Sequence, residues 1–279
     1  MKQTMRRIYP LITLLLILIT TACQTSTGEG EMVISSPTAN STASPPSTPP
    51  ATATAIPSET LTVCTAVLPE SLFPFTEANL ASKANALAMI YQAPFVAVDG
   101  QISPTILERV PTQENGDLSL IPVDVQRGQP VVDAYGNITV LKSGVQVRPS
   151  GCRGWDCIIT WDGTTPLTMD QMSVNFHLRE DLTWSDGAPV VAADSTLRYK
   201  LMAESDDYGS GWAVARTDAY TVIDQKTVGW LGLPGFTTSD LELFFWLPLP
   251  SHLYAAVESL QGLEDEEAIR RSPIGYGPF

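Results

Sequence analysis

One segment in the middle of the chain, residues 173–200 (SVNFHLREDLTWSDGAPVVAADSTLRYK), constrains the fold more than any other. Apolar and polar residues alternate over residues 173–178, which is the two-residue period of a half-buried strand. Residues 185–187 (Ser-Asp-Gly) predict a tight turn, because Asp can bond its own backbone and Gly adopts a positive φ without steric cost. Asp194 stands where a helix N-cap is expected, ahead of apolar residues at helical spacing. The segment therefore predicts a strand, a turn and a capped helix in succession, as in an α/β protein.

The charge of the chain excludes one class of partner. The 279 residues include 16 Lys and Arg against 30 Asp and Glu, a formal net charge of −14. Nucleic acid needs a basic face for its phosphates, so we expect no nucleic-acid partner. The length is enough for one large domain or two smaller ones, and the acidity fits a soluble domain outside the cytoplasm.

The first 22 residues are expected to be a signal peptide of the lipoprotein type. A basic start is followed by an apolar run over residues 8–19 that is too short to span a membrane as a mature helix. Ala22 before Cys23 resembles the bacterial lipobox, in which the Cys is lipidated and becomes the mature N-terminus. Each buried lipid methylene contributes about 0.8 kcal/mol, so two or three chains anchor stably. The alternative is an ordinary signal peptide with an incidental Cys.

Residues 23–58 are expected to form a disordered tether. They are mostly Ser, Thr, Pro, Ala and Gly, with very few large apolar side chains. Such a segment cannot bury enough surface to offset the entropy of ordering it. The globular part is then residues 59–279.

Within the globular part, residues from about 100 to 170 predict a small β-rich subdomain that is mostly antiparallel. Turn-forming Gly residues separate short runs of strand-forming residues. The expected strands are residues 118–125, 138–141, 145–147 and 158–161.

Two cysteines, Cys152 and Cys157, bracket a short loop in this region. A zinc site would need two more ligands at suitable spacing, and none is found. Outside the cytoplasm a disulfide is favoured, and closing so short a loop adds roughly 2 kcal/mol of stability. Cys64, on an apolar strand expected over residues 61–67, is predicted to be a buried free thiol.

Other elements follow from periodicity and turn chemistry. Residues 79–92 predict an amphipathic helix whose apolar face carries Leu80, Ala84, Leu87, Ala88 and Tyr91. The remaining expectations are a hairpin turn at Asp99-Gly100, a hairpin over residues 220–231, core aromatics at 241–247, and helices at 253–260 and 264–270.

Four segments together resemble a known family. Residues 176–199 (FHLREDLTWSDGAPVVAADSTLRY) closely resemble the signature of the extracellular solute-binding proteins of family 5, the peptide- and nickel-type receptors of ABC importers. Residues 68–75 (LPESLFPF) are similar to the bend after that family's first strand. Residues 87–104 resemble its first helix and following hairpin. Residues 272–279 (SPIGYGPF) resemble its Gly-x-Gly-Pro-aromatic hinge segment.

The resemblance implies a fold and a mode of action. The fold is a two-lobed α/β clamshell of the periplasmic-binding-protein-like class II type. This chain would hold the first lobe and the small β-rich subdomain, as an N-terminal fragment without the second lobe. A monomer of the family binds a peptide or another small solute between its lobes, and the closed form docks on an ABC permease and ATPase complex. The resemblance implies no cofactor and no membrane contact except through the lipid anchor.

The resemblance also implies roles for individual residues. The bend would line the cleft and contact the ligand through Ser71, Leu72, Phe73 and Phe75. The alternative for the three apolar residues is plain core. The hinge would be formed by Gly275, Tyr276 and Gly277. The acidic residue that holds the peptide amino terminus in peptide-binding members would lie beyond residue 279.

Two other classes of function remain open at this point. A glycoside hydrolase needs two carboxylates that face each other, and acidic neighbours occur at Asp206-Asp207 and at residues 264–267. Neighbouring carboxylates are usually a solvated surface run, and no nucleophile elbow or phosphate loop is found. A surface adhesin or sensor would also suit an anchor and a tether. His177 and His252 are the only histidines, too few for a metal site, so no catalytic or metal-binding residue is predicted.

Overall fold

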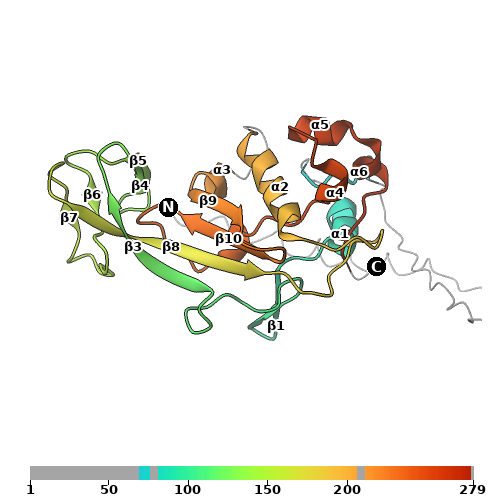
Figure 1. Ribbon diagram of the computed structural model, residues 1–279, viewed down its shortest axis with the longest axis horizontal. Coiled ribbons are helices and arrows are strands. Elements are labelled where there is room, and N and C mark those ends of the chain that lie inside the picture. The colour runs from blue at the N-terminus through green and yellow to red at the C-terminus, as the bar shows by residue number, and fades with distance from the viewer. Residues whose placement is uncertain (1–68, 76–80, 206–210, 278–279) are drawn as a thin grey trace, which may run out of the picture. The chain divides into compact units, whose positions relative to one another are not determined.

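The computed structural model describes residues 69–75, 81–205 and 211–277 (Figure 1). They belong to one compact unit, Leu61–Phe279, with a mixed α/β fold. The expected signal peptide, tether, lipidated Cys23, strand at 61–67 and Cys64 lie outside the described residues, as does Asp206-Asp207. No helix in the described part of the chain is long and apolar enough to cross a membrane.

The centre of the unit is a four-stranded antiparallel sheet in the order β3-β8-β10-β9. Its strands are β3 (Leu118–Val125), β8 (Leu167–His177), β9 (Thr217–Val222) and β10 (Thr227–Gly232). The predicted hairpin over residues 220–231 is confirmed as β9 and β10. In β8, Val174 and Phe176 are fully buried, as the alternation predicted, and so is Leu178 just beyond its end.

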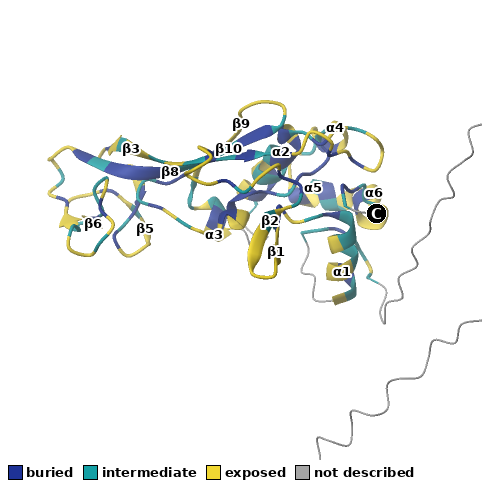
Figure 2. Cartoon of the chain, turned by 90° about the horizontal axis from the view of Figure 1, so that it is seen from below, coloured by how far each residue is buried: buried dark blue, intermediate teal, exposed yellow. Residues whose placement is uncertain are grey.

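Strand β8 begins earlier than expected, and this changes the interpretation of the β-rich region. Its first half is buried on both faces and includes Asp170 and Gln171, so it shows no alternating pattern (Figure 2). The Gln171 amide donates to Asp218 Oδ2 at 2.8 Å and to Gly232 O at 2.9 Å, which satisfies the buried polar group. A boundary at residue 170 would cut this strand, so the β-rich part extends the main sheet.

The far end of this sheet has its own small core. Two short hairpins, β4 (Pro130–Val132) with β5 (Ile138–Val140) and β6 (Gln146–Val147) with β7 (Ile159–Thr160), lie beside the ends of β3 and β8 (Figure 1). The expected strands are confirmed in place: β3 has the expected bounds, β5, β6 and β7 are shorter than expected, and β4 was not predicted. The core that they enclose consists of Val125, Val131, Leu141, Val147, Trp161, Leu167 and Met169.

The hairpin of β1 (Phe95–Val98) and β2 (Gln101–Pro104) is formed as predicted. Asp99 and Gly100 both have positive φ, 51° and 77°, as a two-residue hairpin turn requires.

Helix α2 (Ala192–Ala203) packs against β9 and β10, and its cap differs from the prediction. The N-cap is Val191, with extended backbone, and Asp194 lies at the third helical position. Asp194 Oδ2 accepts the Val191 N–H at 2.9 Å, so the carboxylate reaches back to the start of the helix. Because Asp can serve at either position, the sequence did not distinguish them.

Helix α1 (Ala81–Ile90) exists, and its predicted apolar face is correct only in part. Leu87 and Tyr91 contact the core as expected, together with Ile90, whereas Ala84 and Ala88 are exposed and Lys83 is buried. Leu80 lies outside the described residues. Alanine contributes little apolar area, so its spacing did not decide which side of the helix is buried.

The C-terminal helices are shorter than expected. After α3 (Gly211–Val214), the aromatic segment forms a 3₁₀ helix, η1 (Leu241–Phe244), within the core as predicted. The single helix expected at 253–260 is instead α4 (Ser251–Tyr254) and α5 (Leu260–Asp265), because Ser259 caps α5 by accepting the Gly262 N–H at 3.0 Å. The second expected helix is α6 (Glu267–Arg271).

Candidate functional site

The segments that resemble the solute-binding family are far apart in the chain and meet at one place. We call this place the junction and define it by Phe75, Tyr91, Trp184, Arg198 and Tyr276. These residues come from the bend, the end of α1, the turn after β8, α2 and the end of the described chain. In this part of the fold, α4 packs against α2.

Residues 275–277 are bound to the end of α1. The N–H groups of Tyr276 and Gly277 both donate to Ile90 O, at 3.1 and 2.8 Å. Gly275 O accepts the Ser185 N–H at 2.8 Å, so the same segment is bound to the Ser-Asp-Gly turn. A Cβ at Gly275 would overlap Ile90 O, and one at Gly277 would overlap Met89 O. Glycine is therefore required at both positions by the close approach of backbone to backbone.

Tyr276 packs between two other aromatic residues. Its ring centroid lies 5.1 Å from that of Trp184 and 5.7 Å from that of Tyr91, both in edge-on arrangements. Tyr276 is 4 % exposed, and burial raises the pKa of its hydroxyl far above the ordinary value. The hinge role of Gly275, Tyr276 and Gly277 remains a prediction, but this segment joins α1 to the turn after β8.

The bend contributes core and partly buried residues to the junction. Phe73 is 0 % exposed and packs on Phe75 at 5.3 Å between ring centroids, which agrees with the alternative that it is a core residue. Ser71, Leu72 and Phe75 are partly buried. Leu72 N–H donates to Arg270 O at 2.7 Å, which attaches the bend to α6.

Asp194 holds three elements together beneath the junction. Besides the Val191 N–H, its carboxylate accepts the Trp184 indole N–H at 3.0 Å and both the N–H, at 2.9 Å, and the hydroxyl of Ser251. Asp194 is 1 % exposed, and these donors satisfy a buried carboxylate that would otherwise be costly. The carboxylate thus fixes α2 against the turn after β8 and the start of α4.

Arg198 is the cation of the junction. Its guanidinium carbon lies 4.5 Å from the ring centroid of Phe75, a cation–π distance. Burial lowers the pKa of Arg198, while the hydroxyls of Tyr276, Tyr91 and Tyr220 act in the opposite direction. The sequence analysis did not single out Arg198. The one signal for it was its position four residues after Asp194, which would have predicted only a local ion pair.

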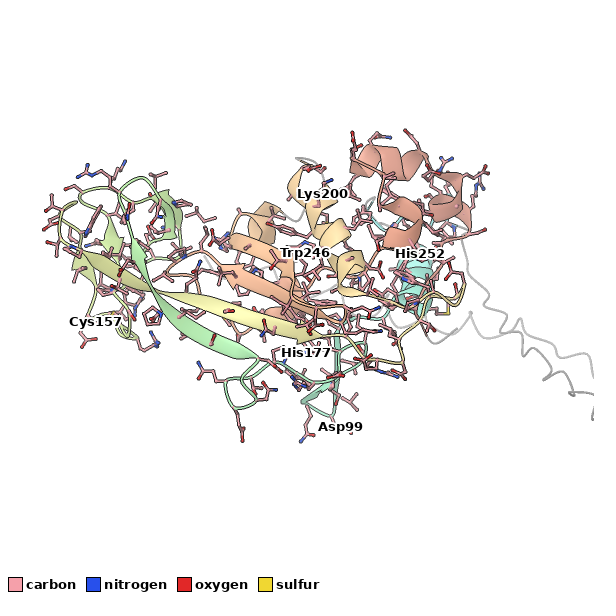
Figure 3. The ribbon with its side chains drawn as sticks, in the orientation of Figure 1. Asp99, Cys157, His177, Lys200, Trp246 and His252 are labelled. Carbon is pink, nitrogen blue, oxygen red and sulfur yellow. A yellow bond between two sulfur atoms is a disulfide. The ribbon has the colours of Figure 1, made fainter. Side chains whose placement is uncertain are left out.

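A second candidate lies at the other end of the sheet. Cys152 and Cys157 are joined at an S–S distance of 2.07 Å, and Cys157 lies at the end of the unit opposite His252 (Figure 3). Beside this disulfide is a cavity of about 640 Å³ lined in part by Arg148, Arg153 and Asp170.

The charged groups of this cavity already have partners. Asp170 accepts the Ser150 hydroxyl at 2.5 Å and the Arg153 guanidinium at 2.5 Å. Burial acts to raise the pKa of Asp170, but these hydrogen bonds outweigh it and hold the pKa below its ordinary value. Arg148 donates to Ala134 O and Gly154 O and stacks on Trp155. The charged side chains that line the cavity therefore bond to groups of the protein itself.

Each histidine lies beside a carboxylate. His177 Nε2 lies 2.9 Å from Asp117 Oδ1, and His252 Nε2 lies 2.8 Å from Asp186 Oδ2. Within the described ranges, no group of three or more His, Cys, Asp or Glu is arranged to hold a metal ion.

No protein-family model matches the sequence, and no curated protein matches it. The structure is similar to several solved structures, among them three in complex with peptides. The protein from Thermus thermophilus complexed with a pentapeptide is 16 % identical, and the match covers 64 % of this chain and 23 % of that one, with a TM-score of 0.39. AppA from Bacillus subtilis with a nonapeptide is 15 % identical, with 72 % and 29 % covered and a TM-score of 0.41. Listeria monocytogenes OppA bound to peptide is 15 % identical, with 76 % and 34 % covered and a TM-score of 0.44.

The match therefore spans about a quarter to a third of the length of these structures. Because the TM-scores are below 0.5, the functional proposal below rests on the sequence motifs and on the junction.

Proposed function

We propose that this chain belongs to the substrate-binding component of an ABC importer, which captures a peptide or a related small solute outside the cell and delivers it to a membrane permease. The observation that carries the proposal is the junction. The four segments that resemble the solute-binding family converge on it, and Gly275 and Gly277 are required by contacts within it. Such convergence is expected if the segments were retained together as one structural unit.

The proposal includes an attachment to the cell surface. Cys23 would carry the lipid, residues 23–58 would form the tether, and residues 59–279 would form the first lobe with its β-rich extension. The test is incorporation of radioactive palmitate, which we expect in the wild type and not in Cys23→Ser. Equal labelling of both proteins would contradict the anchor and leave solute binding open.

Solute binding is tested with the protein expressed from its complete reading frame. Thermal unfolding is measured with pools of short peptides, of sugars and of nickel chelates. A ligand at a hundred times its Kd stabilises the folded state by about 2.7 kcal/mol, so a binding pool should raise Tm by several degrees. We expect the peptide pool to do so. A chain that no pool stabilises but that hydrolyses a glycoside pool would be an enzyme, and the proposal would be wrong.

A further inference from the structure

The cavity beside the disulfide has an apolar floor on one face of the main sheet. The floor consists of Leu118 and Leu120 of β3 and Met172 of β8. Leu120 is directly opposite Met172 in the register of the two strands, and residues two apart on a strand share a face, so the three side chains lie together. Both leucines are only partly buried. Paired strands therefore present apolar surface to whatever enters the cavity.

The disulfide loop, between β6 and β7, and the loop after β10 form walls of the cavity, and both are attached to β8. In the disulfide loop, the Ser150 N–H donates to Thr168 O at 2.7 Å and the Gly151 N–H donates to Asp170 Oδ2 at 3.1 Å. In the other loop, the Gly235 N–H donates to Asp170 O at 2.8 Å. Walls that are already held in place lose little entropy when a ligand binds. The volume of about 640 Å³ lies within the range of small-molecule sites.

The charged side chains of the cavity leave one positive charge uncompensated. They are Arg148, Arg153 and Asp170. Asp170 pairs with Arg153 Nη1 at 2.5 Å. Arg148 donates to the carbonyl oxygens of Ala134 and Gly154, which carry no net charge, and it forms no ion pair with a carboxylate among the described residues. Two cations thus face one anion, in a chain whose formal net charge is −14.

Arg153 has donors that remain open to a ligand. A guanidinium carries five N–H groups, and the contacts with Asp170 and with Cys152 O involve Nη1 alone. The side chain is 61 % exposed, so its Nε and Nη2 groups are accessible from solvent. Gln113 and Thr237 also line the cavity and are exposed, and neither side chain has a hydrogen bond within the described part of the chain. The edge of the cavity therefore offers hydrogen-bonding groups next to an apolar floor.

We propose that this cavity binds a small monoanion with an apolar body, of the class of carboxylic acids with an aliphatic or aromatic group. The carboxylate accepts hydrogen bonds from Arg153, since two parallel N–H groups match its two oxygens, and the charge of Arg148 lies in the same cavity. The apolar body covers the floor and removes its surface from water. This inference goes beyond the proposed function, because every residue that lines the cavity belongs to this chain and no permease is needed.

Other classes of ligand fit the cavity less well. A cation would face two guanidinium groups and a single carboxylate that is already paired. A phosphate monoester carries nearly two negative charges at neutral pH and has no apolar part for the floor. A neutral hydrocarbon would displace water from the Arg153 donors without replacing its hydrogen bonds.

The test uses hexanoate, hexanamide and acetate as probes of the protein expressed from its complete reading frame, with binding measured by isothermal titration calorimetry. N-acetyl-leucine and its amide are added because the carboxylate can come from a free organic acid or from the end of a peptide. We expect at least one of the two longer carboxylates to bind saturably, and the tighter one identifies the source. Its amide, which lacks the charge, and acetate, which lacks the apolar body, should each bind at least about tenfold more weakly.

The probes alone can overturn the proposal. No saturable binding of either longer carboxylate would do so. Equal affinities for a carboxylate and its amide would show that the charge is not recognised, and equal affinities for hexanoate and acetate would show that the floor is not used.

Two variants and a matched control locate the site. Arg153→Met should weaken carboxylate binding about tenfold or more and leave amide binding unchanged, and Leu120→Ala should weaken both about threefold to tenfold. The control is Arg127→Met, which removes an exposed arginine that bonds to Gly163 O and does not line the cavity. Circular dichroism verifies that each variant is folded. Unchanged carboxylate affinity in folded Arg153→Met, or an equal loss in the control, would refute the site.

Discussion

The substitution Gly275→Ala tests the packing of residues 275–277 against α1. The added Cβ would overlap the Ile90 carbonyl oxygen and lie 2.6 Å from Ile90 Cγ2. The carbonyl belongs to the helix backbone and cannot move away, so the segment must shift. The shift breaks or lengthens three backbone hydrogen bonds, from Tyr276 and Gly277 to Ile90 O and from Ser185 to Gly275 O, each worth about 1 kcal/mol.

Partial exposure of the Tyr276 ring adds about 1 kcal/mol to this cost. We therefore expect Gly275→Ala to lower the free energy of unfolding by about 4 kcal/mol, measured by urea unfolding followed through tryptophan fluorescence. The matched control is Gly262→Ala, in α5, where the nearest atoms to a Cβ are Ser259 Oγ at 3.4 Å and Val257 Cγ1 at 3.6 Å. Ala at this helical position should be neutral or stabilise by up to about 1 kcal/mol. A loss below about 0.5 kcal/mol for Gly275→Ala would refute the close contact.

Three further predictions concern groups away from residues 275–277. Asp194→Ala leaves a buried indole N–H without an acceptor and should cost about 3 kcal/mol in urea unfolding, and a cost below about 1 kcal/mol would contradict the network. The Arg109 guanidinium lowers the pKa of Asp117, so this pair stabilises the fold above the unfolded pKa of about 3.9, and the stability is lost as pH falls below that value. Asp117→Asn should flatten the acid-side slope of stability against pH. An unchanged slope would count against the pair. Reduction of Cys152–Cys157 should lower stability by roughly 2 kcal/mol without changing far-UV circular dichroism, whereas global unfolding on reduction would show that the disulfide does more than close a loop.

The sequence predicted most of the fold where polar and apolar residues alternate plainly. The second half of β8, with Val174 and Phe176, and the β1–β2 turn at Asp99-Gly100 were predicted correctly because each depends on local chemistry. The first half of β8 was missed because it is buried on both faces, and Gln171 is tolerated there only through partners far along the chain.

The candidate site was less predictable, for a physical reason. The motifs identified the segments, but the contacts among them are tertiary. Asp194 was expected to be an N-cap, whereas its main partners are Trp184 and Ser251, elements that the fold alone brings to it. Arg198 contacts the ring of Phe75, which lies far from it in the sequence, and no local pattern predicts that contact.

The central claim is that the protein binds a small solute. Its most direct test is mass spectrometry of the molecules released on denaturing the protein purified from its complete reading frame. We expect one solute class in near-stoichiometric amount. Purified protein that carries no solute and binds none from the peptide, sugar and chelate pools would contradict the account.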